Sequence, residues 1–112
     1  MVIATLLLLT QLSVQQPSAF EFDYLDADLT TGSVTRFEMQ IDDGAWGSIG
    51  IPTDTAPISG GRTYRVPVPA LVPGDHTVRI RACNVDVCST AAVLTFRLIV
   101  MPVAPTNLRI RG

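Results

Sequence analysis

The sequence predicts an all-β domain of seven antiparallel strands arranged as a two-sheet β-sandwich, with an extended tail after the last strand. Three observations predict this class. Apolar and polar residues alternate with period two in several short stretches, which is the pattern of half-buried strands. Gly, Pro, Asp and Asn separate these stretches at short intervals, as turns do. No stretch shows the period of an amphipathic helix, so a sandwich is the architecture that buries these strands.

Length and composition bound the class of protein. With 112 residues the chain has the size of one domain, which we assign to residues 1–100, followed by a Pro-containing tail at 101–112. Charged residues make up only 16% of the chain, against about 25% in typical globular domains. So little charge suggests that part of the surface faces a partner rather than water. The net charge of −2 argues against nucleic-acid binding, which needs a concentrated basic face.

The strongest strand signal is a long hairpin with arms at 77–82 and 94–100. Its first arm places Val78, Ile80 and Ala82 on one face and polar residues on the other. The second arm alternates in the same way, so each arm should have one buried side. Further strands are predicted at 1–14, 19–24, 34–41, 45–49 and 62–68, and the segments 25–33 and 50–61 are predicted as loops.

The first fourteen residues admit two interpretations. The apolar run Leu6–Leu9 is typical of a secretory signal peptide, but no Lys or Arg precedes it and no small-residue cleavage site follows it. A membrane-spanning helix needs about 20 apolar residues, and polar residues interrupt the run from Thr10 onward. We therefore interpret residues 1–14 as a first strand with two apolar faces, and we expect no membrane span.

Cys83 and Cys88 are the two cysteines of the chain, and four residues separate them in the hairpin loop. That spacing can place them opposite each other at the mouth of the hairpin. A zinc site needs four ligands, and the single histidine, His76, cannot complete one. We therefore expect a structural disulfide between them, with free thiols as the alternative.

Three motifs resemble the fibronectin type III and immunoglobulin-like sandwiches: AFEFDY as a second strand, FEMQIDDGAW as a third strand with its hairpin, and LVPGDHTVRIRACN leading into a sixth. The resemblance covers roughly residues 2–100. That family usually carries a tyrosine two residues after the glycine of the last motif, where this chain has His76. The tail PVAPTNLRI resembles the opening of a further domain of the same kind. The resemblance implies a seven-stranded antiparallel immunoglobulin/fibronectin type III-like sandwich, a fold that hosts many functions.

The same resemblance suggests a candidate metal site. In the topology of the family, the loops after the second and sixth strands share one end of the sandwich, which would bring Asp26 and Asp28 near Asp86. Calcium takes six to eight oxygen ligands, and three carboxylates could begin such a set. The alternative is that these residues are solvated turn formers. We favour the alternative, so no metal and no other cofactor is expected.

Hydrolytic chemistry is not expected. A catalytic triad needs a histidine base that a third group orients. Asp75 and His76 are neighbours on a predicted strand, so their side chains point to opposite faces. We expect His76 to be a packed or capping residue and the protein not to be an enzyme.

Two surface features admit a binding role and a structural role. Arg79, Arg81 and Arg97 point outward on one sheet, but no aromatic residues alternate with them as in single-strand nucleic-acid sites. We expect these arginines to pair across strands with residues such as Glu38. Trp46, the only tryptophan, could stack on a sugar ring, although a single tryptophan more often packs against the protein or anchors a partner.

We expect a non-enzymatic structural or interaction protein. The leading hypothesis is a component of a viral particle, namely a phage capsid decoration or accessory protein located in the virion. Its basis is an uncleaved Met1, the low charge and the apolar residues near both termini. The alternative is a secreted or surface-exposed adhesion module that binds carbohydrate or protein, and a third possibility is an accessory domain of a larger enzyme.

The expected partner is another protein subunit, including copies of this chain, and neither nucleic acid nor a membrane. The first and last strands of such a fold often lie side by side at a sheet edge, where unpaired backbone can template strand addition. The apolar residues that face away from the core at this edge, together with the start of the tail, form the predicted interface: Ile3, Leu7, Leu9, Val93, Ile99, Met101 and Val103.

Overall fold

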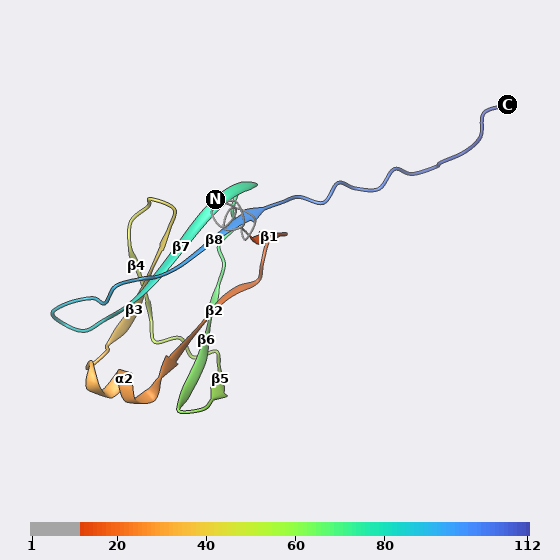
Figure 1. Ribbon diagram of the computed structural model, residues 1–112. Coiled ribbons are helices and arrows are strands. Elements are labelled where there is room, and N and C mark those ends of the chain that lie inside the picture. Colours follow the sequence, from red (N-terminus) through yellow and green to blue (C-terminus); the bar gives the residue numbers. More distant parts are fainter. Residues whose placement is uncertain (1–11) are drawn as a thin grey trace, which may run out of the picture.

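The computed structural model describes residues 12–112, which form two β-sheets and one short helix (Figure 1). The elements are β1 (Leu12–Val14), β2 (Ala19–Leu25), α2 (Asp26–Thr31), β3 (Arg36–Ile41), β4 (Gly47–Gly50), β5 (Thr55–Ile58), β6 (Gly61–Pro67), β7 (Gly74–Cys83) and β8 (Ala92–Leu98). One sheet has the strand order β1-β8-β7-β3-β4 and the other has the order β2-β6-β5. The all-β class predicted from the sequence is confirmed.

The core lies between the two sheets, and the alternation of the sequence determines which side chains enter it. Phe37 on β3 packs edge-on against Phe22 and Tyr24 of β2, with ring centroids 4.9 and 5.1 Å apart. Its ring also lies 5.5 Å from that of Tyr64 on β6. Phe20 on β2 contacts Phe96 on β8 at 5.8 Å. Aromatic pairs between the two sheets therefore form the centre of the core.

The predicted long hairpin is present as β7 and β8, and β7 is the central strand of the larger sheet. β7 pairs with β8 on one side and with β3 on the other, both antiparallel. Val78, Ile80 and Ala82 are buried as the period of two predicts. β7 is the most fully paired strand of this sheet, because it pairs over seven residues with β8 and over six with β3.

The structure differs from the sequence prediction in its strand count and in one strand direction. Residues 12–112 contain eight strands rather than seven, because β5 forms within the segment 50–61 that was predicted as a loop. β5 is only four residues long and contains Pro57, so its sequence has no clear strand pattern. β1 runs parallel to β8, whereas an all-antiparallel arrangement was predicted.

The helix α2 also lies in a segment that was predicted as a loop. It has six residues, too few for a hydrophobic period to be visible in the sequence. Asp26 and Asp28 lie in its first turn, where carboxylates interact favourably with the helix dipole. Leu29 is partly buried and packs against the core, so the helix closes one end of the space between the sheets.

The tail leaves the two sheets as an extended segment (Figure 1). Residues 101–112 contain no helix or strand, and every one of them is exposed. Among its apolar side chains, Val103, Leu108 and Ile110 are 92%, 98% and 96% exposed. The tail therefore presents apolar side chains to its surroundings without any cover from residues 12–100.

Gly61 provides a test of the smaller sheet. It lies on the central strand β6, pairs with Leu25 and Ile58 on either side, and is buried. A Cβ at this position would overlap the carbonyl of Tyr24 and lie 2.8 Å from Cα of Leu25. We expect Gly61→Ala to lower the free energy of unfolding by about 1–3 kcal/mol, as overpacking does, in urea denaturation.

Gly47→Ala on β4 is the matched control, because a Cβ there meets no atom within 4 Å. Its unfolding midpoint should equal that of the wild type. Equal midpoints for both variants would contradict the close pairing of β2, β5 and β6.

Candidate functional site

The predicted interface lies at the β1 edge of the larger sheet and continues into the tail. β1 and β8 are side by side, and the N–H of Ile99 donates to the carbonyl of Val14 at 2.8 Å. The predicted interface residues within the described part are all exposed: Val93, Ile99, Met101 and Val103. The remaining three lie outside the described residues: Ile3, Leu7 and Leu9. The described half of the predicted interface is therefore an exposed apolar strip.

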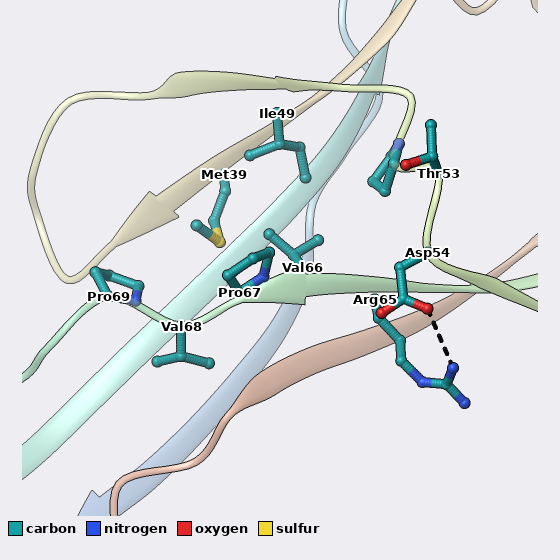
Figure 2. A pocket seen from close by; sticks show the side chains of 10 residues that line it. Met39, Ile49, Thr53, Asp54, Arg65, Val66, Pro67, Val68 and Pro69 are labelled. Atoms are coloured by element: carbon teal, nitrogen blue, oxygen red, sulfur yellow. Dashed lines mark hydrogen bonds and ion pairs between the residues drawn. The ribbon is translucent and has the colours of Figure 1, made fainter.

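A second candidate is a groove of about 690 Å³ between the two sheets on the β4 side, which the sequence did not reveal (Figure 2). Met39 and Ile49 form one wall, and Val66 and Val68 form the other. Prolines from the flanking loop and from the end of β6 complete the lining. Apart from Thr53, Asp54 and Arg65 the lining is apolar, so the groove can hold an apolar side chain.

An ion pair marks one end of this groove. Arg65 on β6 donates to Asp54 at 3.3 Å, as the dashed line in Figure 2 shows, and also to Glu21 on β2. The carboxylate of Glu21 raises the pKa of Arg65, and that of Asp54 adds to the effect. This pair sits in exposed surroundings, where such bridges contribute little stability. The two carboxylates compensate the charge of Arg65 at this end of the groove.

His76 is buried inside a hydrogen-bonded corner. Its Nδ1–H donates to Oδ2 of Asp42 at 2.9 Å, and its Nε2–H donates to the carbonyl of Val72 at 2.6 Å. Both partners are acceptors, so the imidazole makes both bonds only when it is doubly protonated. The prediction that Asp75 and His76 point to opposite faces is confirmed, since Asp75 is exposed.

Asp42 holds this corner together. It has a positive φ of 55°, in the turn after β3 that the sequence Asp-Asp-Gly predicts. Its Oδ1 accepts the N–H of Thr77 at 2.9 Å, and its own N–H donates to the carbonyl of Thr77 at 2.7 Å. The hydrogen bond from Thr77 lowers the pKa of Asp42, and that from His76 lowers it further. The bond to Val72 raises the pKa of His76, and the bond to Asp42 adds to this.

The arginines of the predicted basic strip are engaged within the sheet. Arg81 donates to Glu38 at 2.7 Å, and the expected cross-strand pairing of these two residues is confirmed. Arg79 donates to Gln40 at 3.3 Å, and Arg97 donates to an exposed carboxylate on β7, that of Asp75, also at 3.3 Å. The guanidinium groups of this face are therefore held in hydrogen bonds within the sheet, where Arg81 and Arg97 have carboxylate partners and Arg79 has a neutral one.

Glu38 is the centre of this outer face. It is only slightly exposed and accepts hydrogen bonds from Arg81 and, at 2.9 Å, from Arg36. The bond from Arg81 lowers the pKa of Glu38, with Arg36 contributing next. The guanidinium of Arg81 also lies 3.9 Å from the ring centroid of Trp46, a cation–π contact. One face of Trp46 is thus covered by Arg81 rather than open for a sugar.

The predicted disulfide is present between Cys83 and Cys88. The two residues form an isolated antiparallel bridge that closes the loop between β7 and β8. The side-chain oxygen of Asn84 accepts the N–H groups of Asp86 and Val87, which orders the loop further. The loop is therefore held both covalently and by its own turn.

The three aspartates of the candidate calcium site do not converge. Asp26 and Asp28 belong to α2, and Asp86 is in the disulfide loop. Within residues 12–112, the one group of three potential metal ligands comprises Glu38, Cys83 and Cys88. Both of its sulfurs are used in the disulfide, so this group cannot bind a metal through thiolates.

Comparison with protein-family models, with curated proteins and with solved structures gives no match. Within residues 12–112, no helix is long and apolar enough to cross a bilayer, and α2 has only six residues.

The Asp42–His76 corner predicts a specific pH dependence of stability. The pKa of His76 is raised in the folded state. The contribution of His76 to the free energy of unfolding is therefore complete below its unfolded-state pKa of about 6.5, and it is lost as the pH rises through the folded-state pKa. The pKa of Asp42 is lowered in the folded state. The contribution of Asp42 to the free energy of unfolding is therefore complete above its unfolded-state pKa of about 3.9, and it is lost as the pH falls through the folded-state pKa. We expect urea unfolding to show greatest stability between about pH 4 and 6.5.

His76→Gln should remove the decline on the alkaline side of this window, because the amide does not titrate. Asp43→Asn, one position further along the same turn, should retain it. A wild-type protein whose stability is constant from pH 6.5 to 9 would show that the corner does not hold an imidazolium.

The disulfide predicts that reduction lowers the stability of the folded state modestly. Closing so short a loop stabilises the folded state by about 2 kcal/mol on the chain-entropy model. We expect reductant to lower the free energy of unfolding by about this amount, and thiol titration of the unreduced, unfolded chain to find no free thiol. The control is Cys83→Ala with Cys88→Ala, in which reductant should have no effect. Two free thiols per chain would contradict the disulfide.

Proposed function

We propose that this chain is a non-enzymatic β-sandwich of the immunoglobulin and fibronectin type III class that works as a structural or interaction part of a larger protein assembly. The observation that carries the proposal is the apolar strip of the β1–β8 edge and the tail. Leaving a large aliphatic side chain in water forgoes roughly 1.5–3 kcal/mol of burial per residue. An exposed strip of several such residues is typical of a protein–protein contact.

Two features support the sandwich class. The sheets face each other across one aromatic core, with β2, β5 and β6 in one sheet and the hairpin of β7 and β8 in the other. In addition, His76 donates to the carbonyl of Val72, four residues upstream. The tyrosine of immunoglobulin-like domains makes a similar bond to backbone a few residues upstream. His76 would thus play the part of that tyrosine in this chain.

A phage particle is the assembly that we propose, with the chain as a capsid decoration or accessory protein and other subunits, including further copies, as its partners. Support comes from the low charged fraction of 16% and from the exposed apolar tail. Such a role needs contact surface and stability rather than catalysis.

A secreted or surface-exposed adhesion module is the second candidate. The Cys83–Cys88 disulfide favours it, because disulfides persist mainly in oxidising, extracellular settings. The β4-side groove could then receive an apolar side chain of a protein ligand. Trp46 is less suited to a carbohydrate ligand, since Arg81 covers one of its faces.

The non-enzymatic part of the proposal has its own test. Both nitrogens of His76 are hydrogen-bonded to acceptors, so the side chain has no free base to activate a nucleophile. We expect His76→Ala to reduce stability and to abolish no reaction. Turnover of ester or peptide substrates by the wild type that this variant loses would overturn the assignment.

The contact surface is tested by self-association in sedimentation experiments over a range of concentrations. We expect Ile99→Asp, and separately truncation after Val100, to weaken association at least about tenfold, because a charge or a deletion removes apolar contact. Val85→Asp is the control, since Val85 is also apolar and is even more exposed than Ile99 (83% against 40%) but lies in the disulfide loop. A chain that is monomeric throughout, or variants that all associate like the wild type, would contradict this surface.

A further inference from the structure

A groove between the two sheets runs along β2 on the side opposite β4. One part of it, of about 220 Å³, extends from Phe20 to Phe22, and a second part, of about 120 Å³, extends from Phe22 to Tyr24. Ile80 of β7 and Ala92 of β8 line both parts, so the two parts are continuous. Among the described strands β2 pairs only with β6, and its edge along this groove is therefore open in the described part of the chain.

Leu94 shows that apolar surface in this groove has no cover from residues 12–112. It pairs with Val78 in the β7–β8 ladder, and residues paired in a ladder share a face of the sheet. Val78 is 4% exposed, whereas Leu94 is 43% exposed. The groove therefore leaves a leucine on the core side of the sheet partly in water.

The backbone of β2 presents hydrogen-bonding groups to the open edge. The N–H of Val68 donates to the carbonyl of Ser18 at 3.2 Å, one position beyond the β2–β6 ladder and in the same register. In an antiparallel ladder the hydrogen-bonded pairs recur at every second position, so the even-numbered residues of β2 bond to β6. The N–H and C=O groups of Glu21 and Asp23 therefore point to the open edge.

The outer face of β2 is acidic. The side chains of Glu21 and Asp23 are exposed there. Arg65 on the neighbouring strand β6 is shared between Glu21 and Asp54. Asp23 accepts a hydrogen bond at 2.6 Å from the hydroxyl of Thr63, which is a neutral partner. These side chains together carry three carboxylates and one guanidinium, so this part of the surface is net negative.

The tail contains a segment with the complementary pattern. Residues 108–111 read Leu-Arg-Ile-Arg, so an extended backbone places the two apolar side chains on one face and the two arginines on the other. Residues 101–112 contain no Asp or Glu. Leu108 and Ile110 are 98% and 96% exposed, and the tail projects away from its own two sheets (Figure 1). The segment is therefore available to a second copy of the chain.

We propose that residues 108–111 of one copy add as a strand to the open β2 edge of a second copy. The added strand runs antiparallel to β2, as the other pairs of the smaller sheet do. Arg109 then lies opposite Asp23, and Arg111 lies opposite Glu21. Each arginine faces a carboxylate on the outer face of the sheet, and the backbone of both pairs is oriented for hydrogen bonding.

The same register places the apolar side chains of the tail in the groove. Residues directly opposite each other in a ladder share a face, so Leu108 lies beside Tyr24 and Ile110 lies beside Phe22. Phe22 and Tyr24 both pack against the core and line the groove. Strand addition therefore covers the open side of the core with two residues that are otherwise in water.

This inference rests on the proposed function, because it names the surface that receives the tail. The contact is heterologous, since the tail and the β2 edge are different surfaces of the chain, and such contacts build rings or open chains. A copy that lacks the tail can still receive one, so the donating and receiving surfaces can be tested separately.

The first test is truncation after Thr106, which retains Ile99, Met101 and Val103 but removes the proposed strand. We expect its self-association in sedimentation experiments to be at least about tenfold weaker than that of the wild type. The truncated chain should still bind the full-length chain, because its β2 edge is intact. A truncated chain that self-associates like the wild type would overturn this inference and leave the proposed function standing. A wild type that is monomeric at every concentration would overturn both.

Charge reversal tests the register. Asp23→Arg and Arg109→Asp should each weaken association of the full chain about fivefold, because each places like charges opposite each other. The double variant should associate like the wild type. Asp86→Arg, the same change in the exposed disulfide loop, is the control and should have no effect. Failure of the double variant to recover, or recovery of Asp23→Arg by Arg111→Asp instead, would overturn the antiparallel register.

Amide hydrogen exchange distinguishes a second copy from the tail of the same chain. The N–H groups of Glu21 and Asp23 should exchange rapidly in the dilute monomer and at least about tenfold more slowly in the assembly. Protection of these two amides in the monomer, or no change in their rates on assembly, would overturn the assignment to a second copy.

Discussion

The packing of the Phe37 ring holds the two sheets together. The rest of the structure depends on this contact between the sheets. Phe37 is 1% exposed and contacts three aromatic rings, those of Phe22, Tyr24 and Tyr64, on the facing sheet. Offset and edge-to-face aromatic pairs add about 0.5–1.5 kcal/mol each beyond the area that they bury. These contacts set the distance between the sheets. The grooves between the sheets and the exposed sheet edges therefore lie along the two long sides of the molecule, at β4 and at β8.

The strands with strict alternation could be predicted from the sequence, because one face of each enters the core. The segment 19–24 and the hairpin arms are examples, and the disulfide followed from the spacing of Cys83 and Cys88. β5 and α2 could not be predicted in this way. β5 obtains its strand geometry from pairing with β6, and α2 depends on the burial of Leu29 rather than on any helical period. Both are tertiary effects that no local pattern encodes.

Some features of the surface could likewise be predicted from the sequence, and others could not. Exposed apolar residues after β8 and the Arg81–Glu38 pair could be expected from alternation alone. The corner of Asp42 and His76 could not, because 33 residues separate them in the chain and the bond depends on the turn after β3. The grooves likewise arise where strands of different sheets diverge. The grooves lie on two apolar sides of the molecule, away from the outer face with its hydrogen-bonded arginines, and the β8 side continues into the apolar tail.

The central claim is that this chain functions through the β8 side and the tail. Its most direct test compares amide exchange along the whole chain at a dilution where it is monomeric and at a concentration where it assembles. The account predicts that added protection on assembly is confined to residues 92–112 and to the β2 edge that borders the same groove. Added protection around Met39 and Ile49 on the β4 side, or no difference along the chain between the two conditions, would contradict it.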